Sequence, residues 1–194
     1  MGVLRPSIAG DPSGLWRPAF WPGFFWGLAE GSFFFIVPDV LISWAALAGA
    51  KSGLRTLFSV TVGSIVAGAL LYSWAAMTPM ESRTAVAHVP FVAPHMFETV
   101  AHDYADVGVI AMLRGPSSGI PYKVYAVLAP PVTDLGTFAI VSVLARLERL
   151  GLTWLIFASL GWLFRKPIED HAGLTAVALA VMWSAVYAFY WTRL

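Results

Sequence analysis

Six ionisable residues in this sequence lie inside or beside apolar stretches, where charged side chains are rare. Two of them are acids. Glu30 and Asp39 interrupt the apolar run from Phe20 to Ala50, and Asp39 follows Pro38 directly. A charge at the centre of a bilayer costs about 2.5–3.5 kcal/mol on insertion scales, so such a residue marks a functional site by default. A carboxylate that alternates between ionised and neutral forms can carry a proton, and we interpret both acids as candidates for that role.

Two basic residues accompany a second interrupted run. Arg114 and Lys123 flank the sequence "GPSSGIPY". Arginine and lysine side chains, together with backbone N–H groups freed at a helix break, can hold a phosphate group. Either cation could also hold Glu30 or Asp39 in its ionised form. The sequence therefore predicts a shared site for an anionic headgroup and a proton.

The last two basic residues, Arg146 and Arg149, lie with Glu148 in "ARLERLG". They could contact a headgroup or dock onto the interrupted segments, and a structural ion cluster inside a helix bundle is the alternative. Asp39 also has a structural alternative, because an aspartate can cap the helix that follows it. The sequence leaves these alternatives open.

A further group has spacing that would allow a metal site. His95, Glu98 and His102 are three and four residues apart, so they would share one face of a helix. Two histidines and one acid in an aqueous loop are more typical of a solvated amphipathic face, and we expect no metal site. "RGPSSG" lacks the P-loop pattern, so we expect no nucleotide and no other cofactor. No nucleophile–base pair lies near the interrupted runs, which argues against an enzyme.

The composition predicts an integral membrane protein. Only 12% of the 194 residues are charged and 58% are hydrophobic, whereas about 25% of the residues of a soluble domain are charged. The formal net charge of +1 gives no indication of nucleic-acid binding. The absence of cysteine excludes disulfides and thiolate chemistry.

The apolar runs predict an all-α membrane fold. Three runs are long enough to span a bilayer, at about 20 residues each: 54–77, 133–164 and 173–191. Runs 20–50 and 107–132 are interrupted, and broken helices persist at membrane depth only when they are buried in protein or face water. Paired interrupted segments are typical of transporter sites. We therefore expect two re-entrant helical hairpins that face each other, plus about three full transmembrane helices. Asp39 and the turn Ile120–Lys123 should then approach each other, because isolated charges at this depth are costly.

The charge distribution predicts the topology of this fold. With both hairpins re-entrant, residues 1–19 form a cytoplasmic arm on the same side as Lys51, Arg55 and "RKPIED". The acidic stretch 78–106 forms an extramembrane amphipathic linker on the opposite side, in agreement with the positive-inside rule. Residues 20–194 then make a single membrane domain.

Several motifs together resemble one known family. "AEGSFFFIVPDVLISWAALAG", a Gly/Ser-rich span, "GIPYKVYAVLA" and "LARLERLG" are similar to the DedA superfamily, also called the SNARE-associated or VTT-domain family, with the closest pattern in its YqaA-like branch. The resemblance covers roughly residues 25 to 165. By motif position, it matches Glu30 and Asp39 to the family's hairpin acids, Lys123 to its hairpin base, and Arg146 and Arg149 to its basic pair. The sequence departs from the pattern in having Lys123 where many members have arginine, and "LAPPV" in place of a small Ala-Gly pair.

The resemblance implies a function as well as a fold. The family has two facing membrane-dipping hairpins with flanking spans, and it is associated with moving lipids, including undecaprenyl phosphate carriers and phospholipids, between leaflets, often coupled to the proton gradient. The resemblance thus implies a translocase or scramblase for a phosphate-bearing lipid in the bacterial cytoplasmic (inner) membrane. The alternatives are a structural or accessory subunit of a larger membrane complex and a membrane enzyme acting on lipid phosphate. Expected partners are membrane lipids and, because the chain is short for a transporter, a second copy or a membrane-complex partner, with no nucleic acid.

Overall fold

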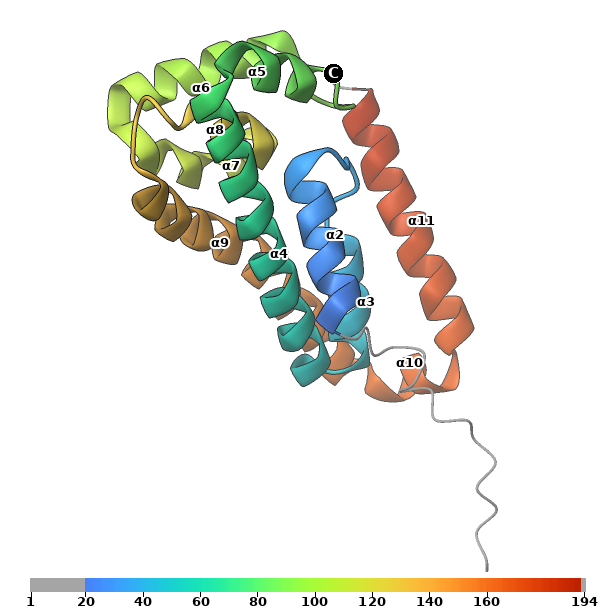
Figure 1. The fold of residues 1–194 in the computed structure, drawn as a ribbon. Helices are drawn as coiled ribbons and strands as arrows, with labels where there is room; N and C mark the ends of the chain where they lie inside the picture. Colours follow the sequence, from blue (N-terminus) through green and yellow to red (C-terminus); the bar gives the residue numbers. More distant parts are fainter. Residues whose placement is uncertain (1–19, 193–194) are drawn as a thin grey trace, which may run out of the picture.

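The computed structural model describes residues 20–192, and the expected arm of residues 1–19 lies outside this range. Every regular element in the described part of the chain is helical, which confirms the all-α prediction (Figure 1). The elements are α2 (Phe20–Ser32), α3 (Asp39–Ala48), α4 (Ala50–Met77), α5 (Pro79–Ala87), α6 (Pro94–Val107), the 3₁₀ helix η1 (Gly108–Arg114), α7 (Gly115–Ser118), α8 (Tyr122–Leu128), α9 (Leu135–Leu163), α10 (Arg165–Asp170) and α11 (Ala172–Trp191).

The first interrupted run forms a helical hairpin. The chain leaves α2 after Ser32 and enters α3 at Asp39, so the break falls around Pro38, where a proline cannot continue a helix. The indole Nε1 of Trp26 donates to the Ile36 carbonyl at 3.1 Å and ties the turn to α2. Figure 1 shows α2 rising and α3 returning, so the hairpin begins and ends at the same end of the molecule.

Glycines allow α2 to lie directly against α4. A Cβ added at Gly27 would overlap the Val60 carbonyl, and one added at Gly63 would overlap the Phe24 carbonyl. The two helices run in the same direction, and Ser64 Oγ donates to the Gly27 carbonyl at 3.3 Å. Such close backbone contact through small residues is typical of helix packing in membranes.

The second interrupted run is also broken where the sequence predicts. The chain passes through η1 and α7, turns at residues 119–121, and returns as α8. Gly119 has φ +73°, a left-handed conformation that favours glycine and ends α7. Beyond α8, the Thr133 carbonyl accepts from Tyr72 Oη at 2.6 Å, near the Met77 end of α4. This segment therefore returns to one end of the molecule, whereas the first hairpin begins and ends at the other (Figure 1).

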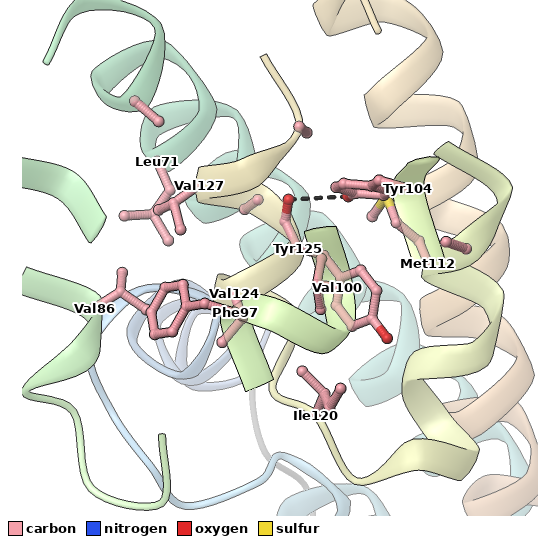
Figure 2. Close-up of a cluster of buried hydrophobic side chains, with 14 of the residues drawn as sticks. Leu71, Val86, Phe97, Val100, Tyr104, Met112, Ile120, Val124, Tyr125 and Val127 are labelled. Carbon is pink, nitrogen blue, oxygen red and sulfur yellow. Dashed lines mark hydrogen bonds between the residues drawn. The ribbon is translucent and has the colours of Figure 1, made fainter. Parts of the chain in front are cut away.

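The linker of residues 78–106 folds onto the second interrupted segment. Its helices α5 and α6 contact α8 and bury one apolar face there. Figure 2 shows this cluster, in which Tyr104 Oη donates to the Tyr125 carbonyl at 3.0 Å. A smaller cluster joins α3, α4 and α9 through Ile42, Val60 and Leu150. One face of the linker therefore belongs to the core.

The two long C-terminal helices complete the bundle. Asp134 caps α9 by accepting from Thr137 N at 3.0 Å and from Thr137 Oγ1 at 2.7 Å. These hydrogen bonds hold the pKa of the Asp134 carboxyl below its usual range. Tyr72 and Phe138, with ring centroids 5.3 Å apart, join α4 to the start of α9. The short helix α10 then reverses the chain into α11, which lies beside α3.

Two of the three expected spans meet the requirements of a transmembrane helix. Within the described residues, Ala50–Met77 and Ala172–Phe189 are long and apolar enough, which gives weak support for membrane association. The third, α9, has 29 residues, but Arg146, Glu148 and Arg149 place three charges near its middle. These charges exclude α9 from the helices that are apolar enough to span a membrane.

Candidate functional site

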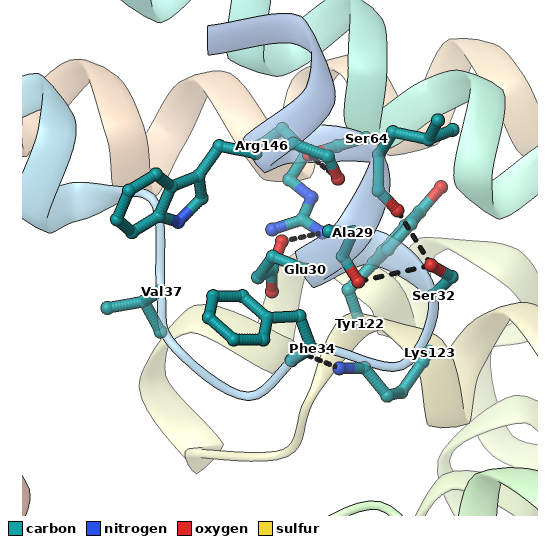
Figure 3. A network of polar contacts seen from close by, with 12 residues as sticks. Ala29, Glu30, Ser32, Phe34, Val37, Ser64, Tyr122, Lys123 and Arg146 are labelled. Atoms are coloured by element: carbon teal, nitrogen blue, oxygen red, sulfur yellow. Dashed lines mark hydrogen bonds and ion pairs between the residues drawn. The ribbon is translucent and has the colours of Figure 1, made fainter. Parts of the chain in front are cut away.

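The turns of the two interrupted segments meet inside the bundle. Lys123 Nζ, at the start of α8, donates to the Phe34 carbonyl in the turn between α2 and α3 at 2.8 Å (Figure 3). A cavity of about 280 Å³ opens beside this contact. Its lining includes three charged side chains and a larger apolar group: Glu30, Lys123 and Arg149, with Phe35, Val37, Pro90, Phe91, Gly115, Gly119, Ile120, Pro121, Trp183, Val186 and Tyr187.

The first acid, Glu30, forms a buried ion pair with α9. Arg146 Nη2 lies 2.8 Å from Glu30 Oε2, and both side chains are almost fully buried (Figure 3). The guanidinium also stacks over the Tyr122 ring, with Cζ 4.3 Å from the centroid, and Tyr122 Oη donates to Ser142 Oγ at 2.9 Å. Glu30 and Arg146 thus form a close ion pair in the interior of the bundle.

The second acid, Asp39, is held by the next turn of α9. Arg149 Nη2 donates to Asp39 Oδ2 at 2.9 Å and Thr153 Oγ1 donates to Oδ1 at 2.6 Å. Asp39 is buried, whereas the Arg149 side chain is 38% exposed. The alternative that Asp39 caps α3 is wrong, because the cap position is Pro38 and no side chain caps this helix.

The expected partners of the acids need correction. Arg114 pairs with Asp103 of α6 at 2.8 Å and does not line the cavity. Lys123 contacts the first turn through the Phe34 carbonyl rather than through Asp39. The two turns do approach each other, as predicted, but the cations that pair with Glu30 and Asp39 come from α9. Arg146 and Arg149 therefore dock α9 onto the first hairpin.

The helix α11 contributes residues that sequence reasoning missed. Tyr187 Oη accepts from Val37 N at 2.6 Å, and Trp183 Nε1 donates to Ser43 Oγ at 3.0 Å. Both aromatic residues line the cavity. The sequence indicated only that aromatic residues are frequent at this end of the helix, and nothing local distinguishes these two from interfacial anchors.

Three aromatic rings cover one side of the cavity. The Phe91 ring lies between Phe35 and Tyr187, with centroid separations of 5.6 Å and 6.4 Å. Phe91 has φ +69°, a rare and strained conformation for a bulky residue. The loop between α5 and α6 thus places an aromatic ring between the first hairpin and α11.

The charges around the cavity do not cancel. Two carboxylates, Glu30 and Asp39, face three cations, Lys123, Arg146 and Arg149. With all five groups ionised, one positive charge remains. The site is therefore suited to a ligand that brings an anionic group and apolar surface together.

The residues with metal-site spacing do not form a metal site. No group of three or more potential metal ligands occurs within the described residues. His95 and Glu98 are exposed, and His102 Nδ1 lies 3.3 Å from Asp106 Oδ2 at the surface.

Comparisons with known proteins found no match among protein-family models, curated proteins or solved structures.

Proposed function

We propose that this protein is an integral membrane protein that moves a phosphate-bearing lipid between leaflets. The observation that carries this proposal is the cavity where two broken-helix turns meet, with Lys123 and Arg149 beside an aromatic wall. Non-helical backbone at membrane depth requires protein or water around it, and both turns lie within the bundle. In the proposed topology, the α2–α3 hairpin and the η1–α8 segment enter from opposite sides of the bilayer. The resemblance to the DedA superfamily supports the same proposal and would imply a bacterial cytoplasmic membrane.

The cavity matches the headgroup rather than the whole lipid. Its volume of about 280 Å³ is near the lower end of ligand pockets, which measure about 300–1,000 Å³. A phosphate group would contact Lys123 and Arg149, since both present N–H donors to the cavity. The acyl chains would stay among the apolar side chains and the surrounding lipid.

The ion pair of Arg149 with Asp39 offers a mechanism for proton coupling. An arriving phosphate competes with Asp39 for the Arg149 guanidinium. Once the pair opens, a buried carboxylate without its cation is costly and takes up a proton. When the phosphate leaves, Asp39 loses the proton and pairs with Arg149 again. Glu30, whose carboxylate is buried and paired with Arg146, is a second candidate proton carrier.

The test is leaflet exchange of a fluorescent phosphate-bearing lipid in proteoliposomes, with and without a pH gradient. We expect Asp39→Asn to abolish the response to the gradient, because the amide cannot exchange a proton. Lys123→Gln should weaken the dependence on a phosphate-bearing headgroup. Glu98→Gln, which removes an exposed carboxylate on α6, is the matched control and should behave as wild type.

Each variant must first be shown to fold, because removing one charge of a buried pair can cost about 3–5 kcal/mol. Folded Asp39→Asn and Lys123→Gln variants that keep the wild-type gradient response and headgroup dependence would refute the proposed mechanism. Absence of protein-dependent lipid exchange in the wild type would refute the translocase. The accessory-subunit alternative would then be favoured.

A further inference from the structure

One charged side chain in the middle of α9 is used by neither hairpin. Glu148 lies between Arg146 and Arg149 in the sequence, but its side chain is exposed, whereas Arg146 is buried and Arg149 is partly buried. None of the ion pairs between described residues includes Glu148. Glu148 therefore faces away from the cavity and has no cation partner among the described residues.

The surroundings of Glu148 on this face are apolar. Leu144 and Leu152, one helical turn before and after it, are 54% and 58% exposed. We call this face the α9 stripe: Ile140, Leu144, Leu147, Glu148, Leu152 and Leu155, all exposed. Gly151 lies beside it, and a Cβ added there would meet nothing within 4 Å. The stripe is thus an exposed apolar surface with one carboxylate.

The position of Glu148 makes an open stripe unfavourable in a membrane. It is the fourteenth residue of a 29-residue helix that begins at Leu135, and it lies within one turn of the residues that pair with Glu30 and Asp39. A carboxylate at this depth normally faces the protein interior, a water-filled cavity or a charged partner. The α9 stripe offers none of these within the described chain.

We propose that the α9 stripe docks a transmembrane helix of another protein that carries an arginine or lysine near its middle. This inference rests on the membrane placement in the proposed function. The leucines pack against the partner helix, Gly151 allows its backbone to approach, and the partner's cation pairs with Glu148. Opposite charge is therefore the feature that selects the occupant.

A second copy of this chain fits the stripe less well. A two-fold dimer brings the same patch of both copies together, so Glu148 would approach its own equivalent. The nearby cations of α9, Arg146 and Arg149, are already paired with Glu30 and Asp39. The stripe itself carries no cation, and the charge pattern favours a different polypeptide.

The experiment measures binding of synthetic transmembrane peptides to the full chain in lipid vesicles. Two labelled leucine–alanine helices are compared, one with a central arginine and one with a central leucine at that position. Because the chain has no cysteine of its own, a single cysteine at Lys166, which is exposed on α10 and lies outside the stripe, can carry the second label for energy transfer. We expect the arginine peptide to bind about threefold to twentyfold more tightly, the range of polar contacts between membrane helices.

Variants at Glu148 decide the outcome. Glu148→Gln and Glu148→Leu should remove the preference for the arginine peptide, whereas Glu98→Gln should retain it. Equal binding of both peptides to wild type would overturn the inference, and so would self-association of the chain that depends on Glu148. Lipid exchange measured in the same vesicles separates the two proposals. Exchange without an arginine preference refutes only the docking surface, and an arginine preference without exchange refutes only the translocase.

Discussion

Arg149 and Asp39 are 110 residues apart in the sequence, yet Arg149 Nη2 donates to Asp39 Oδ2 at 2.9 Å. One turn earlier on the same helix, Arg146 pairs with Glu30. The two contacts differ in burial, because Arg149 is partly exposed and Arg146 is not. The middle of α9 thus contacts both ends of the α2–α3 turn through ion pairs, and the pair of Arg149 is more accessible to solvent than the pair of Arg146.

This difference predicts unequal costs of removing the two arginines. Arg146→Gln leaves Glu30 buried without a cation and should destabilise the fold by about 3–5 kcal/mol. Arg149→Gln should cost less, about 1–2 kcal/mol, because that side chain is partly exposed and Thr153 still donates to Asp39. Thermal unfolding in detergent measures both, with Lys166→Gln on the exposed α10 as a control near wild type. Equal losses of unfolding free energy in the two variants would contradict the conclusion that the Arg146 pair is buried and the Arg149 pair is partly exposed.

The contact between α2 and α4 predicts a steric effect at Gly63. In Gly63→Ala the new Cβ would overlap the Phe24 carbonyl oxygen, so the helices must separate, at a cost of about 1–3 kcal/mol. Gly173→Ala is the matched control, because its Cβ would meet nothing within 4 Å. That variant should be neutral or more stable by about 0.4–1 kcal/mol. Similar unfolding temperatures for the two variants would show that α2 does not pack this closely.

The aromatic wall predicts that Phe91 limits access to the cavity. Phe91→Ala removes the ring between Phe35 and Tyr187 and should speed modification of a cysteine placed at Ile120, a buried residue of the lining, severalfold. The measurement is the rate of labelling by a water-soluble thiol reagent. Phe58→Ala, which removes a ring that is 62% exposed on α4, should leave the rate unchanged. If the labelling rate is the same with and without Phe91→Ala, the Phe91 ring does not limit access to the cavity and contributes only to packing.

The arrangement of the helices predicts which segments share a side of the membrane. The start of α4 and the helix α10 lie at one end of the bundle, and α6 lies at the other (Figure 1). Ser52 belongs to the start of α4, Lys166 to α10 and His102 to α6. Single cysteines at Ser52 and Lys166 should react with an impermeant reagent from the cytoplasmic side, and one at His102 from the opposite side. Labelling of Ser52 and Lys166 from different sides would overturn the re-entrant topology.

The sequence by itself determined where the helices break. Pro38 and Pro121 restrict the backbone and Gly119 permits the positive φ of its turn, so both interruptions appear at the predicted positions. It also indicated that Glu30, Asp39 and Lys123 would lie at depth, since each is embedded in an apolar run. The spacing of Arg146 and Arg149 places them near each other on α9, because residues three apart are neighbours on a helix.

The tertiary structure alone decided which charges meet. Whether Glu30 pairs with Arg146, Arg114 or Lys123 depends on how α9 is rotated against α2 and α3, and that rotation is set by packing along the whole interface. For this reason the sequence did not reveal that Arg114 pairs with Asp103 of α6 rather than with Glu30 or Asp39. The contacts of α11 with the first hairpin could not be predicted for the same reason, because they too depend on how the helices pack. Tyr187 reaches the Val37 amide only because the chain reverses at α10, and no local pattern encodes a contact between residues 150 positions apart.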